Sequence, residues 1–350
     1  MTAPTSTKPI NPPSPGSSIM ESRIIQFDET PDPPEKATKP PFEEALRACA
    51  MNGTEFLEMD IPERRRLIGD WFREGDLGFI FAPRGVGKTW FAHLLIACLT
   101  AGRDLEDWGV PSPARVCLLD GEMPPGDVQA RLRHLDVNGE NLLVLSHQFL
   151  FDQTERSFQL SDAEQRSALL EYCVAEQVEV LVIDNLSSVS NISENDNDQW
   201  PAIGDWLLDF RRKGIAVIVV HHAGRNGQMR GGSRREDPAF WIIRLDDSKE
   251  RTATEKGARF VTTFVKNRNA PQCPNPIDWH LTEDESGKFL IETFAADTAT
   301  LVLQEIRGGL SGCEEISDAL GVVKSTVSKA AKRLEANGQI TIKDRKYHVT

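Results

Sequence analysis

The sequence predicts an α/β fold in which a mainly parallel, twisted sheet is covered by helices. Short apolar runs alternate along the chain with longer segments of helical periodicity, and this order of elements builds an open α/β sheet. The runs are apolar at almost every position, which is typical of parallel strands buried on both faces. The predicted strands are 76–81, 116–119, 142–145, 178–183, 215–220, 241–245, 259–265 and 289–294.

Amphipathic segments between these strands predict the covering helices. The segment 161–177 opens with an S-x-x-E capping box, in which Ser161 would cap the helix. The other predicted helices of this part are 42–51, 90–100, 126–135 and 200–213.

Composition and element order divide the chain into three parts. Residues 1–41 contain ten of the 21 prolines and few residues that could form a core, so we expect a disordered tail. Residues 42–295 carry the α/β pattern, and residues 296–350 form a separate unit. The elements predicted for that unit are helices at 298–307, 313–320 and 324–337 and a hairpin of 340–343 with 346–350. Helix, helix-turn-helix and hairpin in that order predict a winged helix.

Bulk properties exclude several classes of protein. No apolar run approaches the ~20 residues that a membrane span needs, and the N-terminus lacks a charged-then-apolar export signal. The six cysteines are scattered without a C-x-x-C pair, which indicates reduced thiols. A net charge of -13 argues against indiscriminate coating of nucleic acid but leaves room for local basic patches. We therefore expect a cytoplasmic protein that does not bind membranes.

Residues 82–89 read A-P-R-G-V-G-K-T, the phosphate-binding loop pattern with alanine in place of its first glycine. An apolar strand precedes the loop and a helix follows it, as the pattern requires. Backbone N–H groups of such a loop wrap phosphate oxygens at the positive end of the helix. Lys88 would reach the β- and γ-phosphates of ATP, and Thr89 would offer its hydroxyl to Mg²⁺. The expected nucleotide-binding residues are Ala82, Pro83, Arg84, Gly85, Val86, Gly87, Lys88, Thr89 and Trp90.

Two further strands end in carboxylates suited to ATP hydrolysis. The strand 178–183 leads into Asp184, which would bind Mg²⁺ directly or through its water. The strand 116–119 leads into D-G-E-M-P, where Glu122 is the expected general base or water-positioning group. The alternative is that Asp120 forms a turn and Glu122 is a solvated loop residue.

A third strand, 215–220, leads into paired imidazoles at His221 and His222. Ligands in open α/β sheets lie beyond the carboxyl ends of the strands. Either ring could hydrogen-bond the γ-phosphate and report its loss, and a structural histidine is the alternative.

Together these motifs resemble the RecA-like ATPases, especially the RepA-type hexameric helicases with their KaiC and RadA relatives. The phosphate loop, L-D-G-E-M-P, I-D-N-L, H-H and Lys266-Asn267-Arg268 occur in that order, within about residues 55–295. The resemblance implies Mg²⁺-dependent ATP hydrolysis at the subunit interfaces of a ring, by family analogy a hexamer. It also implies that Lys266 and Arg268 are basic fingers presented to the neighbouring subunit's nucleotide; an exposed strand end is the alternative. The expected catalytic residues are Glu122, Lys88, His222, Lys266 and Arg268.

Two basic segments are candidate DNA contacts. The loop 223–235 is rich in glycine and arginine, and in a ring channel it would hold a single-stranded backbone without reading sequence. Alternatively, Arg234 and Arg235 face a neighbour's nucleotide or pair with nearby acids. The helix 324–337 is basic at its start, where a recognition helix meets duplex DNA; contact with protein is the alternative. The expected DNA-binding residues are Arg225, Arg230, Arg234, Arg235, Lys324, Ser325, Thr326, Lys329, Arg333 and Arg345.

We therefore expect an ATP-dependent DNA-binding motor of the RepA helicase type, with ATP and Mg²⁺ as cofactors. Replication or maintenance of a plasmid or other mobile element is the setting that analogy gives. The alternative is an ATP-dependent switch, in which nucleotide controls assembly and the winged helix binds DNA without translocation. A small-molecule kinase is a third reading, which the winged helix and the basic finger pair disfavour.

Overall fold

A computed structural model describes residues 40–190, 200–224, 236–248, 257–271, 273–284, 289–296, 298–320 and 322–350. The predicted tail at 1–41 therefore lies almost wholly outside the described residues. The loop arginines predicted to bind DNA also lie outside them; these are Arg225, Arg230, Arg234 and Arg235. The chain forms two compact units, Met1–Pro62 and Glu63–Thr350.

The first unit contains two short helices whose side chains are not buried. α1 (Phe42–Cys49) ends before the predicted 42–51, because Ala50 is already extended. α2 (Gly53–Glu58) begins at a capping box. The Asn52 side chain accepts the backbone N–H of Glu55 at 3.0 Å, and the Glu55 carboxylate accepts the N–H of Asn52 at 3.1 Å.

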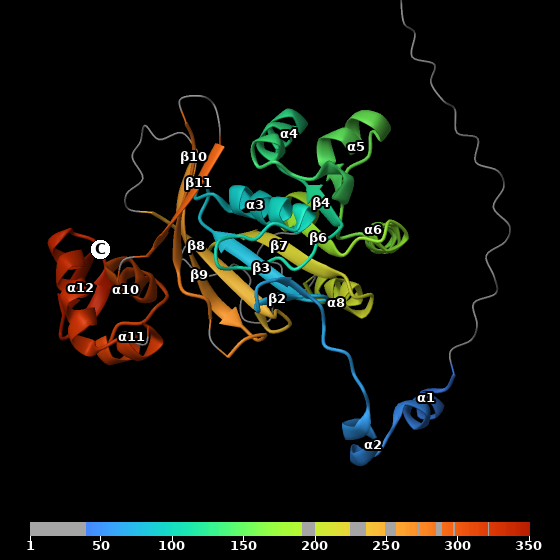
Figure 1. Ribbon diagram of the computed structural model, residues 1–350, viewed down its shortest axis with the longest axis horizontal. Coiled ribbons are helices and arrows are strands. Elements are labelled where there is room, and N and C mark those ends of the chain that lie inside the picture. Colours follow the sequence, from blue (N-terminus) through green and yellow to red (C-terminus); the bar gives the residue numbers. More distant parts are fainter. Residues whose placement is uncertain are drawn as a thin grey trace, which may run out of the picture. The chain divides into compact units, whose positions relative to one another are not determined.

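A nine-stranded sheet lies at the centre of the second unit (Figure 1), in the order β11-β10-β9-β8-β3-β7-β6-β4-β5. The strands are β3 (Leu77–Ala82), β4 (Val116–Asp120), β5 (Leu142–Ser146), β6 (Val180–Asp184), β7 (Ala216–His222), β8 (Trp241–Asp247), β9 (Ala258–Asn267), β10 (Ile277–Glu283) and β11 (Phe289–Ala295). All neighbours from β8 to β5 are parallel, whereas β8, β9, β10 and β11 pair antiparallel. The predicted α/β fold with a mainly parallel sheet is confirmed. A separate ribbon pairs β1 (Arg66–Ile68) with β2 (Phe72–Arg73).

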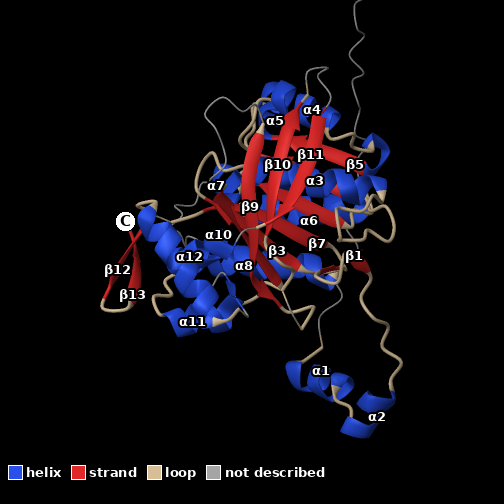
Figure 2. Ribbon diagram, turned by 60° about the vertical axis from the view of Figure 1, so that its left-hand side comes forward, coloured by secondary structure: helices blue, strands red, loops and turns tan. Residues whose placement is uncertain are grey.

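The strand β10 is absent from the predicted strands. Figure 2 shows it between β9 and β11. Its residues Ile277, Trp279 and Leu281 alternate with polar residues, and Trp279 and Leu281 are buried. This is the period of two of a half-buried antiparallel strand, not the continuous apolar run of a strand covered on both faces.

Helices cover both faces of the sheet (Figure 1), so alternate residues of a strand enter two different cores. The helices are α3 (Lys88–Ala101), α4 (Pro125–His134), α5 (His147–Thr154), α6 (Ala163–Ala175), α7 (Leu186–Ser190) and α8 (Trp200–Arg212). In β4, Val116 and Leu118 pack in the core of α3 and α4, whereas Cys117 and Leu119 pack in the core of α6 and α8. This two-sided burial explains why the parallel strands are apolar throughout.

The predicted capping box of α6 is wrong. Asp162, not Ser161, is the N-cap residue, and its side chain accepts the N–H of Glu164 at 2.9 Å. A carboxylate is a charged acceptor, and the positive end of a helix favours it over a hydroxyl one residue earlier.

The last part of the second unit has a small core of its own. Three helices precede a two-stranded hairpin, with Val302, Ile316 and Val327 among the buried residues. The elements are α10 (Thr298–Arg307), α11 (Cys313–Leu320), α12 (Lys324–Ala336), β12 (Ile340–Lys343) and β13 (Lys346–Val349). α10 also contacts the large sheet, because the Thr263 hydroxyl of β9 donates to the Gln304 side-chain oxygen at 2.7 Å. Within the described ranges, no helix combines the length and apolarity that crossing a bilayer requires.

Candidate functional site

The phosphate loop joins the end of β3 to the start of α3. Gly87 has a φ of 125°, and a Cβ there would lie 2.6 Å from the ring of Phe260 on β9, so both backbone and space require glycine. Lys88 is buried, and its amine donates to the carbonyl oxygens of Ala82 at 3.2 Å and Pro83 at 2.9 Å. These neutral acceptors hold the amine beside the loop, and a charged phosphate oxygen would be a stronger partner.

A cavity of about 510 Å³ opens beside the loop, within the range of small-molecule sites. Its lining residues are Arg84, Gly85, Gly87, Lys88, Thr89, Trp90, Glu122, Arg131, His222, Gly257 and Ala258. Ala82 and Val86 are also among the predicted nucleotide-binding residues. Their side chains pack in the hydrophobic core, so only their backbone groups are available to a phosphate. Three separate predicted motifs thus meet at one cavity, and the cations Arg84, Lys88 and Arg131 suit it to a polyphosphate.

Asp184 provides a fitting site for Mg²⁺. It is 2% exposed, and burial raises its pKa to about 7; the hydrogen bond with Thr89 and the charge of Lys88 lower that pKa, whereas Asp120 and Glu122 raise it. Among the described residues, nothing hydrogen-bonds its Oδ2. An orphaned carboxylate oxygen beside a threonine hydroxyl is a donor set that Mg²⁺ accepts, so Asp184 and Thr89 could hold the ion that neutralises this charge.

Asn185 joins Glu122 to His222. Its Nδ2 donates to Oε2 of Glu122 and lies 3.4 Å from Nε2 of His222. Its Oδ1 accepts from the hydroxyl groups of Ser187 at 2.5 Å and Ser188 at 3.0 Å, which fixes the orientation of the amide. Asn185 stands in the I-D-N-L motif but has no predicted role. Its partners lie 63 and 37 residues away, so no local pattern reveals it.

Of the two paired imidazoles, the structure brings His222 to the cavity. His221 lies opposite Phe81 and His222 opposite Ala82 in the register of β7 on β3. Burial lowers the pKa of His222, and the charge of Lys88 lowers it further. The ring is therefore neutral at neutral pH, with one nitrogen able to donate and one to accept.

Arg131 of α4 also lines the cavity, although the sequence predicts no role for it. Its guanidinium lies 4.8 Å from the ring centroid of Trp90, and Trp90 stacks on Phe289 at 5.0 Å. Burial lowers the pKa of Arg131, whereas the charge of Asp184 raises it, and a guanidinium stays charged at any ordinary pH. No feature of the sequence distinguishes Arg131 from the exposed Arg133 on the same helix.

The structure does not bring the predicted finger residues to this cavity. β9 begins at Ala258, which lines the cavity, and runs antiparallel to β8. Lys266 and Arg268 therefore lie at the far end of the strand. The Lys266 amine donates to the backbone oxygens of Glu236 and Asp237, and burial lowers its pKa. Within one chain, these two cations cannot act on the nucleotide site that Lys88 defines.

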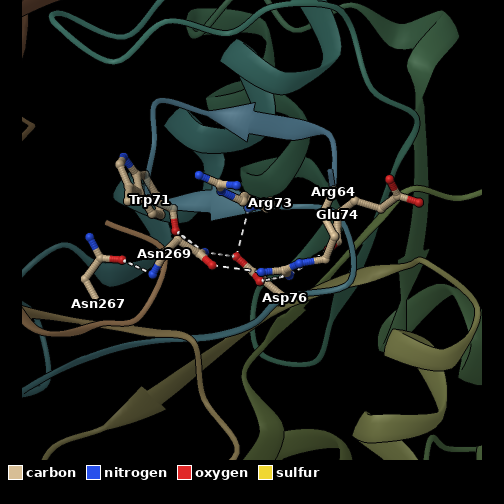
Figure 3. A network of polar contacts seen from close by, with 7 residues as sticks. All are labelled: Arg64, Trp71, Arg73, Glu74, Asp76, Asn267 and Asn269. Carbon is tan, nitrogen blue, oxygen red and sulfur yellow. Dashed lines mark hydrogen bonds and ion pairs between the residues drawn. The ribbon is translucent and has the colours of Figure 1, made fainter. Parts of the chain in front are cut away.

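A polar network holds the segment after Lys266-Asn267-Arg268 against the base of β3 (Figure 3). The Asn269 side-chain amide donates to Asp76 at 2.5 Å and to the Trp71 carbonyl oxygen at 2.8 Å. Arg64 donates to Asp76 at 2.5 Å and to the Asn269 side-chain oxygen at 2.9 Å. Burial raises the pKa of Asp76, and Arg64 counteracts this. The exposed Arg268 thus projects from a fixed base.

The predicted DNA-binding residues of the last part lie on one helix and its hairpin. Lys324, Ser325, Lys329 and Arg333 of α12 are exposed and Thr326 is half-buried. Lys324 is paired, because its amine lies 2.6 Å from a Glu314 carboxylate oxygen. Arg345 is exposed in the turn of the hairpin, with a φ of 60°.

A phosphate loop at the end of β3, with acidic and imidazole side chains from neighbouring parallel strands, defines a P-loop ATPase. The model of the AAA_25 family, an AAA domain, matches residues 44–228. That is more than half of the chain, and the chain belongs to this family. The chain thus combines an AAA domain with a phosphate loop at the end of a mainly parallel sheet.

Two solved structures are similar to this chain at low identity. A KaiC-like protein, PH0186 from Pyrococcus horikoshii OT3, has 16% identity and a TM-score of 0.46 over 66% of this chain and 100% of its own. The flagellar accessory protein FlaH from Methanocaldococcus jannaschii has 11% identity and a TM-score of 0.43 over 63% of this chain and 90% of its own. No curated protein matches the chain.

Proposed function

We propose that the chain is a Mg²⁺-dependent ATPase of the RepA helicase type that moves on or remodels DNA. The observation that carries the proposal is the convergence of Lys88, Thr89, Glu122 and His222 on one cavity, with Asp184 buried behind Thr89. Replication or maintenance of a mobile element remains the setting that analogy gives.

Each side chain has a role in hydrolysis. Lys88 would leave its backbone acceptors for the β- and γ-phosphates, and Thr89 and Asp184 would hold Mg²⁺, which neutralises phosphate charge when bound. Glu122 would orient the attacking water and accept its proton. Asn185 keeps that carboxylate in place, and the neutral His222 can hydrogen-bond the γ-phosphate.

The position of the finger residues supports self-association. Lys266 and Arg268 lie at the end of β9 remote from the cavity, yet Arg268 projects from a rigid network. A second copy of the chain could receive these cations at its own nucleotide, where they would stabilise transition-state charge. We therefore propose a ring, by family analogy a hexamer.

The residues 298–350 support DNA binding. We assign α11 and α12 to a helix-turn-helix and β12 and β13 to the wing of a winged helix. The side of α12 opposite its buried Val327 and Leu334 carries exposed Lys329 and Lys332, and the hairpin adds Arg345. These cations would bind phosphates of duplex DNA. The arginine loop at 225–235 is the proposed contact for a single strand.

ATP hydrolysis measured with no DNA, single-stranded DNA and duplex DNA tests the proposal, together with the mass of the assembly with nucleotide. A motor turns over faster with single-stranded DNA and loses this stimulation when Arg230 and Arg234 become alanine. A switch hydrolyses slowly whatever DNA is present and binds only duplex. A chain that stays monomeric and does not hydrolyse ATP contradicts both functions.

The duplex-binding role needs substitutions and not a truncation. Deleting α10 would remove the Gln304 contact to β9 and disturb the ATPase core. Lys329→Glu with Lys332→Glu leaves that contact intact and should weaken duplex binding while basal turnover is retained. Lys213→Glu with Arg156→Glu, which makes the same change of net charge at two exposed positions outside residues 298–350, is the matched control. An equal loss of duplex binding in both proteins would mean that net charge alone determines the affinity.

A further inference from the structure

His93 is a buried imidazole without a hydrogen bond. It lies on α3 four residues after Thr89, so the two side chains share a face of the helix. The residue is 0% exposed, and neither ring nitrogen has a partner among the described residues. Buried polar groups are almost always satisfied, so two orphaned nitrogens on one ring require an explanation.

Two buried carboxylates stand beside this imidazole with one orphaned oxygen each. A ligand atom of His93, one of Asp120 and one of Asp184 all lie within 4.8 Å of one another. Oδ1 of Asp120 accepts the backbone N–H groups of Glu122 at 3.3 Å and Met123 at 2.9 Å. Oδ2 of Asp120 and Oδ2 of Asp184 have no partner in the described part of the chain. Three buried side chains thus direct unpaired atoms, each able to bind a metal ion, toward one small space.

We propose that His93, Asp120 and Asp184 bind a divalent transition-metal ion, of the class of Mn²⁺, Co²⁺ or Zn²⁺, before any nucleotide is present. A dication compensates the two carboxylate charges, which would otherwise be buried side by side. Lys88 and Arg131 also place positive charge near Asp184, but the orphaned oxygens accept no hydrogen bond from them within the described residues.

The donor set determines which ion fits. Mg²⁺ prefers six oxygen ligands and keeps most of its water, so a dry site with an imidazole disfavours it. Mn²⁺, Co²⁺ and Zn²⁺ accept imidazole and carboxylate together. The site overlaps the Mg²⁺ site of the proposed function at Asp184, but it adds His93 and Asp120 and needs no phosphate. The two sites share Asp184, so an ion here would fix the orientation of that carboxylate below Thr89.

Equilibrium binding of Mn²⁺ to the full chain without nucleotide tests this site. The electron paramagnetic resonance signal of free Mn²⁺ is followed during titration in a millimolar excess of Mg²⁺. We expect one bound Mn²⁺ per chain, and affinity reduced by at least about tenfold in His93→Leu and in Asp120→Asn. His348→Leu, an exposed histidine on β13, should bind like the wild type. An absence of bound Mn²⁺ in the wild type, or equal affinity in His93→Leu, would overturn the proposal.

Thermal unfolding keeps the test decisive if a variant folds poorly. Leucine removes two orphaned nitrogens, so His93→Leu without metal should melt at or above the wild-type temperature. Added Mn²⁺ should raise the melting temperature of the wild type and leave that of His93→Leu unchanged. A metal shift of equal size in both proteins would place the ion elsewhere. Lys88→Ala should abolish ATP binding and retain Mn²⁺ binding, so failure of the ATPase function and failure of the metal site are separable.

Discussion

Asp120 lies directly opposite Asp184 where the parallel strands β4 and β6 end. Burial raises the pKa of both carboxyl groups, and each is also raised by neighbouring acidic groups. The end of the sheet therefore concentrates negative charge in a dry place, next to the loop that would bind a phosphate. Protonation of Asp184, the charges of Lys88 and Arg131, and a bound metal ion can each offset it.

The stability of the protein should depend on pH through Asp184. Because its pKa rises from 3.8 to about 7 on folding, its contribution to the free energy of unfolding is largest below about pH 4. That contribution declines as the pH rises to about 7 and is constant above it. Asp184→Asn removes the decline, so the variant should gain stability relative to wild type over this interval, by at most about 4 kcal/mol. Urea unfolding without metal or nucleotide measures the difference.

Asp107→Asn, the same substitution at an exposed aspartate, is the control for this measurement. If the free energy of unfolding depends on pH in the same way for wild type and Asp184→Asn between pH 4 and pH 7, Asp184 does not take up a proton on folding.

Asn185→Ala should slow ATP turnover and spare ATP binding. The substitution releases Glu122 and removes its link to His222. A misplaced catalytic carboxylate costs roughly 10- to 100-fold in kcat, whereas KM should change little. Asn138→Ala, at the cap of the short helix Gly139–Asn141, is the matched asparagine control. A purely structural role for Asn185 is indicated if turnover falls only in proportion to the folded fraction.

Gly87→Ala should disrupt the phosphate loop. The new Cβ would lie 2.6 Å from a ring carbon of Phe260, at a φ of 125° that side chains rarely adopt. We expect loss of nucleotide binding and a stability cost of roughly 1–3 kcal/mol. Gly126→Ala meets no atom within 4 Å and serves as the control. Binding of a fluorescent ATP analogue and thermal unfolding give the two readouts, and unchanged binding in Gly87→Ala would contradict the loop geometry.

Asn269→Leu should loosen the segment that carries the proposed finger residues Lys266 and Arg268. The change removes two donors and one acceptor from the network of Figure 3 and leaves buried Asp76 with fewer partners. The expected cost is about 1–3 kcal/mol of unfolding free energy, with loss of ATP turnover at high protein concentration. Arg268→Ala should lose the same turnover at little cost in stability, because Arg268 is exposed. Full turnover in both variants would remove the finger assignment.

The fold follows from local signals in most places. Continuous apolar runs between helical segments predict the parallel strands, because burial on both faces leaves no room for polar alternation. The pattern fails at β10, where alternate polar residues mark a half-covered antiparallel strand, and at α6, where Asp162 is the better cap. It also fails at α5, a helix that was not predicted, although Ser146 caps it by accepting the N–H of Phe149. These misses concern local signals that the sequence contained.

The sequence alone determined the phosphate loop, the carboxylates Asp120, Glu122 and Asp184, and the strand ends on which they stand. Each of these motifs is a continuous stretch of the chain, so its chemistry can be predicted without knowing which distant residues contact it. Only the tertiary structure decided that Asn185 links Glu122 to His222 and that Lys266 and Arg268 lie far from the cavity of their own chain. Strand order and register set these relationships between distant segments, and they depend on packing that no local pattern encodes.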